Sequence, residues 1–243
     1  TYSGTQNNGN VGGQTLTIPG ASWSQTFGYD GANRLASVSE GSSWSQHFDY
    51  DAFGNRWVSS SSLALSPLTP QAQAGYNAAT NQLTSSLFQY DASGNQTLVS
   101  PWRIAYDGEN RQVSVTNTGT GAATTYSYDG DGHRVTKTTG GNTTLYIYSG
   151  AGELAAEYST QAQAPLCNTR FLGVDHLGST RMVMDESGAV KARHDYFPWG
   201  EELLTASRTG ALGYQANDGV SQKFTGKERD AETGLDFFGA RYF

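Results

Sequence analysis

Aromatic and polar residues alternate along much of the chain, and the clearest run spans residues 23–29, Trp-Ser-Gln-Thr-Phe-Gly-Tyr. Its tryptophan, glutamine, phenylalanine and tyrosine share one parity, whereas its serine, threonine and glycine residues share the other. Successive side chains of a strand point to opposite faces of a sheet, so this run predicts a strand with one aromatic face. The pattern returns with two substitutions at residues 44–50. Later runs keep a large apolar residue two positions before a tyrosine: Phe88 and Tyr90, Ile104 and Tyr106, Tyr126 and Tyr128, Tyr146 and Tyr148.

Each run ends in a tyrosine that is followed by a turn. The Tyr-Asp pairs are Tyr29-Asp30, Tyr50-Asp51, Tyr90-Asp91, Tyr106-Asp107 and Tyr128-Asp129, and weaker copies open at Tyr76 and Tyr148. Aspartate at the start of a turn can bind the backbone two residues on, and the Gly or Asn that follows tolerates a positive φ. The repeated unit is therefore a β-hairpin, and hairpins in series bury their aromatic faces together. We expect the tyrosines to be core residues and the aspartates to be turn residues.

These patterns divide the chain into segments. Residues 1–20 form a polar N-terminal segment, in which residues 16–18 are a candidate strand. The hairpins occupy residues 21–158 and are interrupted by an inserted loop at 59–75, which contains a serine run and two prolines. After a loop-like stretch the repeat pattern ends, and residues 169–243 have a different sequence pattern. There we expect a further pair of strands and, at 201–207, one or two helical turns.

Composition agrees with an all-β protein. Of 243 residues, 30 are glycine and 12% are aromatic, whereas only 15% are charged. The formal charge of −7 does not attract a phosphate backbone and predicts no nucleic-acid partner. The chain has one cysteine, Cys167, so it cannot form an intrachain disulfide. No charged neighbour in the sequence supports a reactive thiol at Cys167. No apolar run reaches membrane-spanning length. Because the chain begins at Thr1 without a signal peptide, we expect a segment of a longer protein.

Candidate catalytic chemistry is sparse. The histidines do not have a metalloprotease spacing, and Asp129-Gly-Asp131-Gly-His133 lacks the later ligands of a calcium loop, so we interpret it as a turn. His176 follows Asp175, and His194 precedes Asp195. We expect hydrogen-bonded pairs that fix hairpins in place. We therefore predict no catalytic residue, cofactor or metal, and a protein that is not an enzyme.

The repeated Tyr-Asp-x-x-Gly-Asn-Arg pattern resembles the YD repeat of the RHS family of bacterial surface and toxin proteins, which includes polymorphic toxin shells and insecticidal toxin complexes. The vertebrate teneurins carry a similar repeat. Residues 169–243 resemble the RHS repeat-associated core, truncated before the self-cleavage motifs of that family, and Trp199 stands where the family usually has phenylalanine. The residues that carry this second resemblance are Asp175, His176, Gly178, Ser179, Arg181, Tyr196, Pro198, Gly200, Gly226, Glu228, Gly234, Leu235 and Arg241.

The resemblance implies a curved or spiralling antiparallel sheet that forms part of a β-shell. It also implies a function: a non-enzymatic segment of a secreted or cell-surface bacterial shell that encapsulates or displays a C-terminal toxin. Its partners would be the rest of the shell and this cargo.

Two alternatives assign a different role. The first is an extracellular carbohydrate-binding module in which Trp23, Trp44, Trp57 and Trp102 stack on sugar rings. The second is a filament or surface module that associates with itself through open strand edges. Solvent exposure of the tryptophans would favour the first of these, and their burial would favour the shell.

Overall fold

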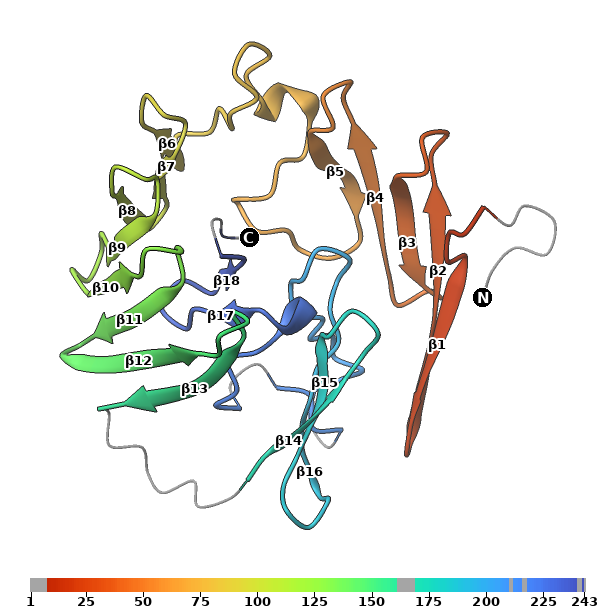
Figure 1. Ribbon diagram of the computed structural model, residues 1–243. Helices are drawn as coiled ribbons and strands as arrows, with labels where there is room; N and C mark the ends of the chain where they lie inside the picture. Colours follow the sequence, from red (N-terminus) through yellow and green to blue (C-terminus); the bar gives the residue numbers. More distant parts are fainter. Residues whose placement is uncertain (1–7, 161–168, 210–211, 216–217, 240–241, 243) are drawn as a thin grey trace. The chain divides into compact units, whose positions relative to one another are not determined.

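The structure is a computed structural model that describes residues 8–160, 169–209, 212–215, 218–239 and 242 (Figure 1). Its strands pair in antiparallel fashion, and the helices among these residues are two single 3-10 turns, η1 (Gln73–Gly75) and η2 (Phe224–Gly226). The prediction of an all-β fold made of consecutive hairpins is therefore confirmed. The chain divides into two compact units, one of residues 1–90 and 98–100 and one of residues 91–97 and 101–243.

The first unit contains a five-stranded sheet whose strands follow one another in sequence order. Its strands are β1 (Gly13–Ile18), β2 (Ala21–Tyr29), β3 (Leu35–Glu40), β4 (Trp44–Tyr50) and β5 (Arg56–Ser61). One face buries Trp23, Val38, Trp44, Phe48 and Val58, as the alternation predicts. The other face carries serine and threonine pairs that are hydrogen-bonded across strands, such as Thr26 with Ser39 at 2.8 Å.

Two strands of this unit are longer than the sequence pattern indicates. The predicted polar segment 1–20 contains a complete edge strand, because β1 pairs with β2 from Gly13 to Ile18. The insertion expected at 59–75 begins later, since β5 continues to Ser61. The loop that follows returns to the sheet, where the backbone N–H of Val58 donates to the carbonyl of Pro70 at 2.9 Å.

An eight-stranded sheet has the order β13-β12-β11-β10-β9-β8-β7-β6. Its strands are β6 (Phe88–Tyr90), β7 (Gln96–Val99), β8 (Trp102–Tyr106), β9 (Gln112–Asn117), β10 (Ala123–Tyr128), β11 (Arg134–Thr139), β12 (Asn142–Tyr148) and β13 (Leu154–Ser159). In Figure 1, β8 to β13 lie side by side. The register shifts immediately before Tyr106, Tyr128 and Tyr148. A bulge changes the direction in which the side chains of its strand point, so the same bulge before each of these tyrosines gives them the same orientation.

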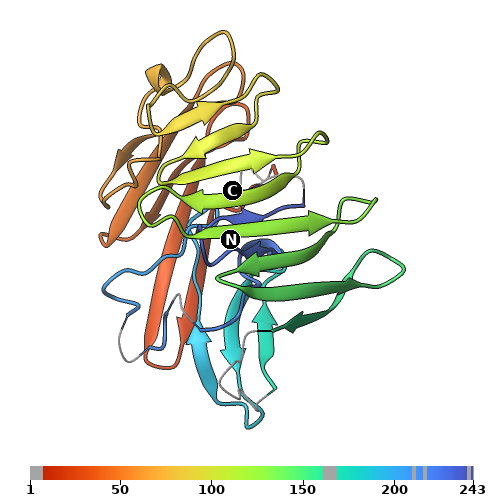
Figure 2. The same cartoon turned by 90° about the vertical axis from the view of Figure 1, so that its left-hand side faces the viewer.

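The C-terminal part of the second unit starts with a three-stranded sheet of β14 (Phe171–Val174), β15 (Thr180–Met184) and β16 (Val190–Arg193). It ends with the short pair β17 (Glu228–Arg229) and β18 (Asp236–Phe237), which lies beside β10 to β12 in Figures 1 and 2. The helical turns expected at 201–207 are absent. The chain is extended at 202–203, because Glu202 bridges to Tyr196, Leu203 donates its N–H to the carbonyl of Asp195 at 2.7 Å, and the Leu203 side chain is fully buried. A single hydrogen-bonded turn follows at 205–209.

Candidate functional site

Each repeat aspartate organises the turn that follows it. The Oδ1 atom of Asp30 accepts hydrogen bonds from the backbone N–H groups of Ala32 and Arg34 at 2.9 and 2.8 Å, and its Oδ2 atom accepts from Arg34 Nε at 2.7 Å. Asp51, Asp91, Asp107 and Asp129 bind the residues two and four positions on in the same way. These hydrogen bonds, led by the one from the Arg34 backbone, hold the pKa of Asp30 below its usual range. The turn interpretation of these aspartates is therefore correct.

The repeat tyrosines, expected to be core residues, are half-buried, and their hydroxyl groups join neighbouring hairpins. Tyr50 donates to the carbonyl of Leu35 at 2.7 Å, and Tyr128 donates to that of Gln112 at the same distance. The same bond joins Tyr29 to Val11, Tyr76 to Arg56, Tyr106 to Gln96, Tyr148 to Arg134 and Tyr196 to Thr180. Tyr90 instead accepts from the N–H of Leu83 at 3.1 Å. We call these contacts the interhairpin tyrosine bonds. Burial raises the pKa of Tyr106 to about 12, so this hydroxyl keeps its proton.

An arginine at the end of two of the turns makes a second connection between repeats. The guanidinium of Arg34 lies 4.4 Å from the centre of the Tyr50 ring and donates to the carbonyl of Asp51 at 3.3 Å. Arg111 has the same relation to Tyr128 and Asp129, at 5.4 and 3.2 Å. Sequence reasoning missed both contacts, although the Asn-Arg that closes these turns was a visible signal. The repeats are thus joined by backbone pairing, by hydroxyl groups and by cation–π contacts.

The residues of the predicted core motif come together from distant parts of the sequence. Asp175 forms the same turn as the repeats, accepting from the N–H groups of Leu177 and Ser179 at 2.9 Å. The Ser179 hydroxyl then accepts from the N–H of Thr225 at 3.1 Å, so this turn is joined to η2. A Cβ atom on Gly200, whose φ is +100°, would lie 2.8 Å from the Phe224 ring. This close approach explains why glycine occupies position 200.

Other residues of the core motif lie in turns or where two backbone segments approach closely. Pro198 lies in the turn in which Phe197 donates to the carbonyl of Glu201 at 2.8 Å, and Gly234 and Leu235 follow Asp230 in another turn. Gly178 and Gly226 approach one another, since a Cβ atom on Gly226 would lie 3.3 Å from the Gly178 carbonyl oxygen. His176 is exposed. Arg241 and Cys167 lie outside the described residues.

A buried charge cluster fastens β17 and the turn after it to the face of β10 to β12; we call it the Arg134 cluster. The Arg134 side chain is 1% exposed and binds both carboxylate oxygens of Asp230, itself 0% exposed, at 2.9 and 3.1 Å. Lys137 binds Asp230 at 2.7 Å and Glu232 at 2.9 Å. The cluster consists of Arg134, Lys137, Glu228, Asp230 and Glu232. The hydroxyl groups of Tyr126 and Tyr146 donate hydrogen bonds to Glu232 and Glu228, and the Arg134 guanidinium donates to the hydroxyl oxygen of Tyr242.

Aromatic rings surround the central arginine of this cluster. The Arg134 guanidinium lies 3.9 Å from the Phe237 ring centre and 4.5 Å from that of Tyr126. Burial works to lower the pKa of Arg134, but Asp230, Tyr242 and Glu228 together outweigh burial and raise that pKa. Burial raises the pKa of Glu228 above its ordinary value. Nothing in the local sequence predicted this cluster, because 96 residues separate Arg134 from Asp230.

His194 and the adjacent Asp195 do not pair with each other. The Asp195 carboxylate binds Arg181 and, at 2.6 Å, Arg208, whereas His194 binds Asp218 at 2.9 Å. Adjacent residues of an extended segment point in opposite directions, so His194 and Asp195 reach different partners.

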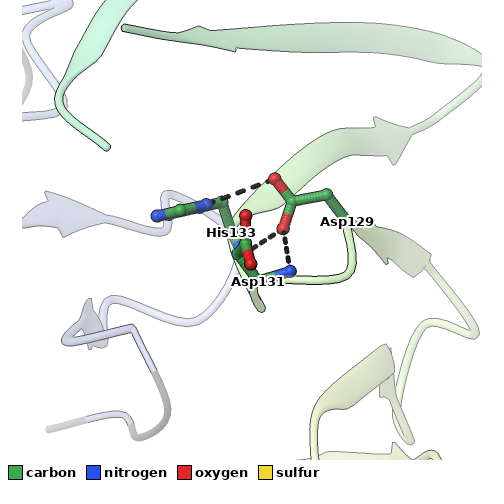
Figure 3. A group of neighbouring side chains, drawn as sticks. All are labelled: Asp129, Asp131 and His133. Carbon is green, nitrogen blue, oxygen red and sulfur yellow. Dashed lines mark hydrogen bonds and ion pairs between the residues drawn. The ribbon is translucent and has the colours of Figure 1, made fainter. Parts of the chain in front are cut away.

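The turn at Asp129, Asp131 and His133 is the one group of possible metal ligands found among the described residues, with ligand atoms within 4.8 Å of one another (Figure 3). His133 Nδ1 lies 3.2 Å from Asp129 Oδ2, where other repeats place an arginine or asparagine donor. The turn borders a cavity of about 550 Å³ that it shares with the loop at 149–152. Every contact of Asp129 within this group has a counterpart in the other turns, which agrees with the interpretation as a turn.

Two of the four tryptophans proposed for sugar stacking are core residues. Trp23 is 8% exposed and Trp44 is 2% exposed, whereas Trp57 and Trp102 are half-buried. Aromatic stacking on a sugar needs an accessible ring face, so burial removes Trp23 and Trp44 from a glycan site.

No helix among the residues that the structure describes is long and apolar enough to cross a membrane.

The hairpin series and its joined C-terminal segment define the class of protein as an antiparallel all-β repeat protein, and comparisons with known proteins add relatives. No family model matches the sequence. The chain is 25% identical, in an alignment of 237 positions that covers 88% of its length, to the tRNA3(Ser)-specific nuclease WapA of Bacillus spizizenii and to the tRNA nuclease WapA of Bacillus subtilis strain 168. It is 28% identical over 188 residues to the tRNA(Glu)-specific nuclease WapA of Bacillus subtilis subsp. natto. The chain spans only 10% of the length of the first two relatives.

Solved structures share the fold. The crystal structure of TcdB2-TccC3 matches 91% of the chain with a TM-score of 0.54 and 19% identity, and 12% of that chain is covered. The Photorhabdus luminescens Tc holotoxin pore matches 91% of the chain with a TM-score of 0.53 and 20% identity, covering 11% of its own chain. The protein is thus similar in sequence to WapA tRNA nucleases and in fold to TcdB2-TccC3 and the Tc holotoxin pore.

Proposed function

We propose that this chain is a non-enzymatic wall segment of a larger RHS-type β-shell, in which YD-repeat hairpins enclose or display a C-terminal effector polypeptide. The observation that carries the proposal is the series of interhairpin tyrosine bonds. Each bond joins one hairpin to the backbone of the preceding one, from Tyr29 to Tyr148. Bonds that face the neighbouring repeat in this way favour a continuous wall over a reaction centre.

The position of the C-terminal segment supports a carrier role. The Arg134 cluster fixes residues 228–232 against β10 to β12, with Asp230 fully buried beneath Arg134 and Lys137. A polypeptide that continues after this segment would therefore leave from a fixed point on the sheet. The buried cations are paired with the carboxylates of Asp230, Glu228 and Glu232, which is the arrangement expected of an anchor and not of an open catalytic centre.

The comparisons are compatible with this role. One solved structure is TcdB2-TccC3 without its hypervariable C-terminal region, so a protein of the same fold carries a variable C-terminal part. The nuclease activity named for the WapA proteins belongs to chains about ten times as long, and we propose that such an activity lies outside the segment that matches here. We further propose a secreted or cell-surface location, by analogy with a toxin component.

The test uses the full-length product of the gene that encodes this segment. Electron cryomicroscopy should show the edges at β1 and β13 paired with further strands, and polypeptide density inside the wall. Limited proteolysis should leave the downstream polypeptide intact until the wall is unfolded. A downstream polypeptide that is digested at the same rate in the native protein and in urea would refute the shell role. Reproducible turnover of RNA, peptide or glycan by the isolated chain would refute the non-enzymatic role.

Self-association has one supporting observation. Strand β13 is the end strand of its sheet and exposes Leu154 and Tyr158, with Leu145 and Ile147 exposed on the neighbouring strand β12. An apolar edge strand is a template for pairing with another chain. Sedimentation of the isolated chain at increasing concentration distinguishes an associating edge from a stable monomer. Because no comparable observation supports glycan binding, we do not propose it.

A further inference from the structure

A buried histidine lies at the centre of a second charge cluster, separate from the Arg134 cluster. His194 follows β16, and its side chain is 0% exposed. Its Nε2 atom lies 2.9 Å from Asp218 Oδ2, and its Nδ1 atom lies 3.3 Å from Glu202 Oε1. The two carboxylates come from separate loops, so the imidazole ring joins three segments of the C-terminal region.

The two short distances determine which protonation state fits. Neutral imidazole carries one N–H group and can donate to only one of two acceptors. The 2.9 Å contact with Asp218 requires a proton on Nε2, so a neutral ring would turn the lone pair of Nδ1 toward the Glu202 carboxylate at 3.3 Å inside the protein. The imidazolium form instead donates from Nε2 to Asp218 and presents a positively charged N–H group to the Glu202 carboxylate, with which it makes an ion pair at 3.3 Å without hydrogen-bond geometry.

The charges around His194 favour the same state. Facing the ring or its two partners are the carboxylates of Asp218, Glu202 and Asp236 and the cations of Lys223 and Arg229, all largely buried. Three carboxylates against two cations leave an excess negative charge, which a proton on His194 neutralises. Lys223 Nζ lies 3.4 Å from His194 Nε2 and opposes that proton, but it also binds Asp218 at 2.7 Å.

The remaining neighbours of His194 do not change the balance of charge around its ring. The Tyr196 ring stacks near the imidazole with centres 6.4 Å apart and supplies no charge. The adjacent Asp195 carboxylate is directed to Arg181 and Arg208.

We infer that His194 is a proton-dependent lock: in its protonated form it fastens the loops that carry Glu202 and Asp218 to the end of β16, and loss of the proton loosens them. The pKa of His194 is raised, since its bonds to Asp218 and Glu202 outweigh the opposing effect of burial. A group whose pKa is higher in the folded than in the unfolded state stabilises the fold fully below its unfolded pKa of about 6.5. That stabilisation is lost as the pH rises through the folded pKa. The C-terminal region should therefore be tightest in mildly acidic solution and loosen toward alkaline pH, which goes beyond the proposed wall function.

The decisive experiment observes the imidazole directly in the unaltered chain. Long-range nitrogen–proton NMR spectra of the histidine rings, recorded from pH 5 to 9, report which ring nitrogens carry protons. We expect both His194 nitrogens to be protonated at pH 6.5 and the titration midpoint to lie above that value. A neutral His194 ring at pH 6.5 would overturn the inference.

Variants add a directional check. Glu202→Gln should move the His194 midpoint down, and Lys223→Met should move it up, whereas His47→Gln, which changes an exposed histidine, should leave it unchanged. Hydrogen exchange of residues 218–229, corrected for intrinsic rates, should lose protection by as much as tenfold per pH unit between the unfolded and folded pKa values. His194→Gln should remove that pH dependence. The inference would also be overturned if the His194→Gln chain and the unaltered chain showed the same pH dependence of exchange. It would equally be overturned if the His194 midpoint moved in the opposite direction in both Glu202→Gln and Lys223→Met.

Discussion

Replacing Arg134 with methionine tests the claim that the Arg134 cluster holds the C-terminal segment on the sheet. The change keeps an unbranched apolar side chain but leaves the Asp230 carboxylate, 0% exposed, without its bidentate partner. Removing one member of a buried ion pair typically costs about 3–5 kcal/mol, because the remaining charge is desolvated and uncompensated. Lys137 still binds Asp230 at 2.7 Å, which places the expected loss near the lower end of that range.

The expected loss corresponds to about a hundredfold increase in the unfolding equilibrium constant, since each 1.36 kcal/mol or so is a factor of ten. Urea denaturation followed by far-ultraviolet circular dichroism measures the global effect. Because the chain has two compact units, hydrogen exchange of residues 228–237 measures the local effect separately. Both should change, and the exchange of β2 to β4 should not.

Two controls make the result specific. Arg103→Met removes an exposed arginine from β8 and should change stability by less than about 0.5 kcal/mol. Adding Asp230→Asn to Arg134→Met removes the stranded charge and should recover part of the loss. A cost of Arg134→Met below about 1 kcal/mol, or one equal to that of Arg103→Met, would refute the reasoning.

Three further predictions address the repeats and the tryptophans. Tyr128→Phe removes one interhairpin tyrosine bond and should cost about 0.5–1.5 kcal/mol in urea denaturation, whereas Tyr158→Phe, which alters an exposed hydroxyl, should cost little. Gly200→Ala should lower the melting temperature, because it places a Cβ atom 2.8 Å from Phe224 at a φ of +100°; an unchanged melting temperature would contradict that packing. Titration with oligosaccharides should leave the fluorescence of Trp23 and Trp44 unchanged, as measured in a chain in which Trp57, Trp102 and Trp199 are all replaced by phenylalanine; a saturable change would contradict their burial.

The amino-acid sequence by itself determined the local structure of the repeats. The alternation from Trp23 to Tyr29 identified the buried face of β2, and the Asp51 turn followed from contacts that span only two to four residues. Such features are predictable because one segment contains both the side chain and its partner. The helical turns expected at 201–207 show the limit of local pattern, since the burial of Leu203 and its bond to Asp195 select an extended backbone.

Only the tertiary structure decided which distant charges meet. The tyrosine hydroxyls were predicted as core atoms, but their acceptors lie on the preceding hairpin, which is brought close by strand pairing. Asp230 reaches Arg134 and Asp218 reaches His194 because the chain folds back on its own sheet after β16. No periodicity encodes such a return, since burial and the pairing of opposite charges depend on residues that are far apart in sequence. The sequence therefore specified the hairpins, whereas the fold determined how they are joined and where the C-terminal segment is held.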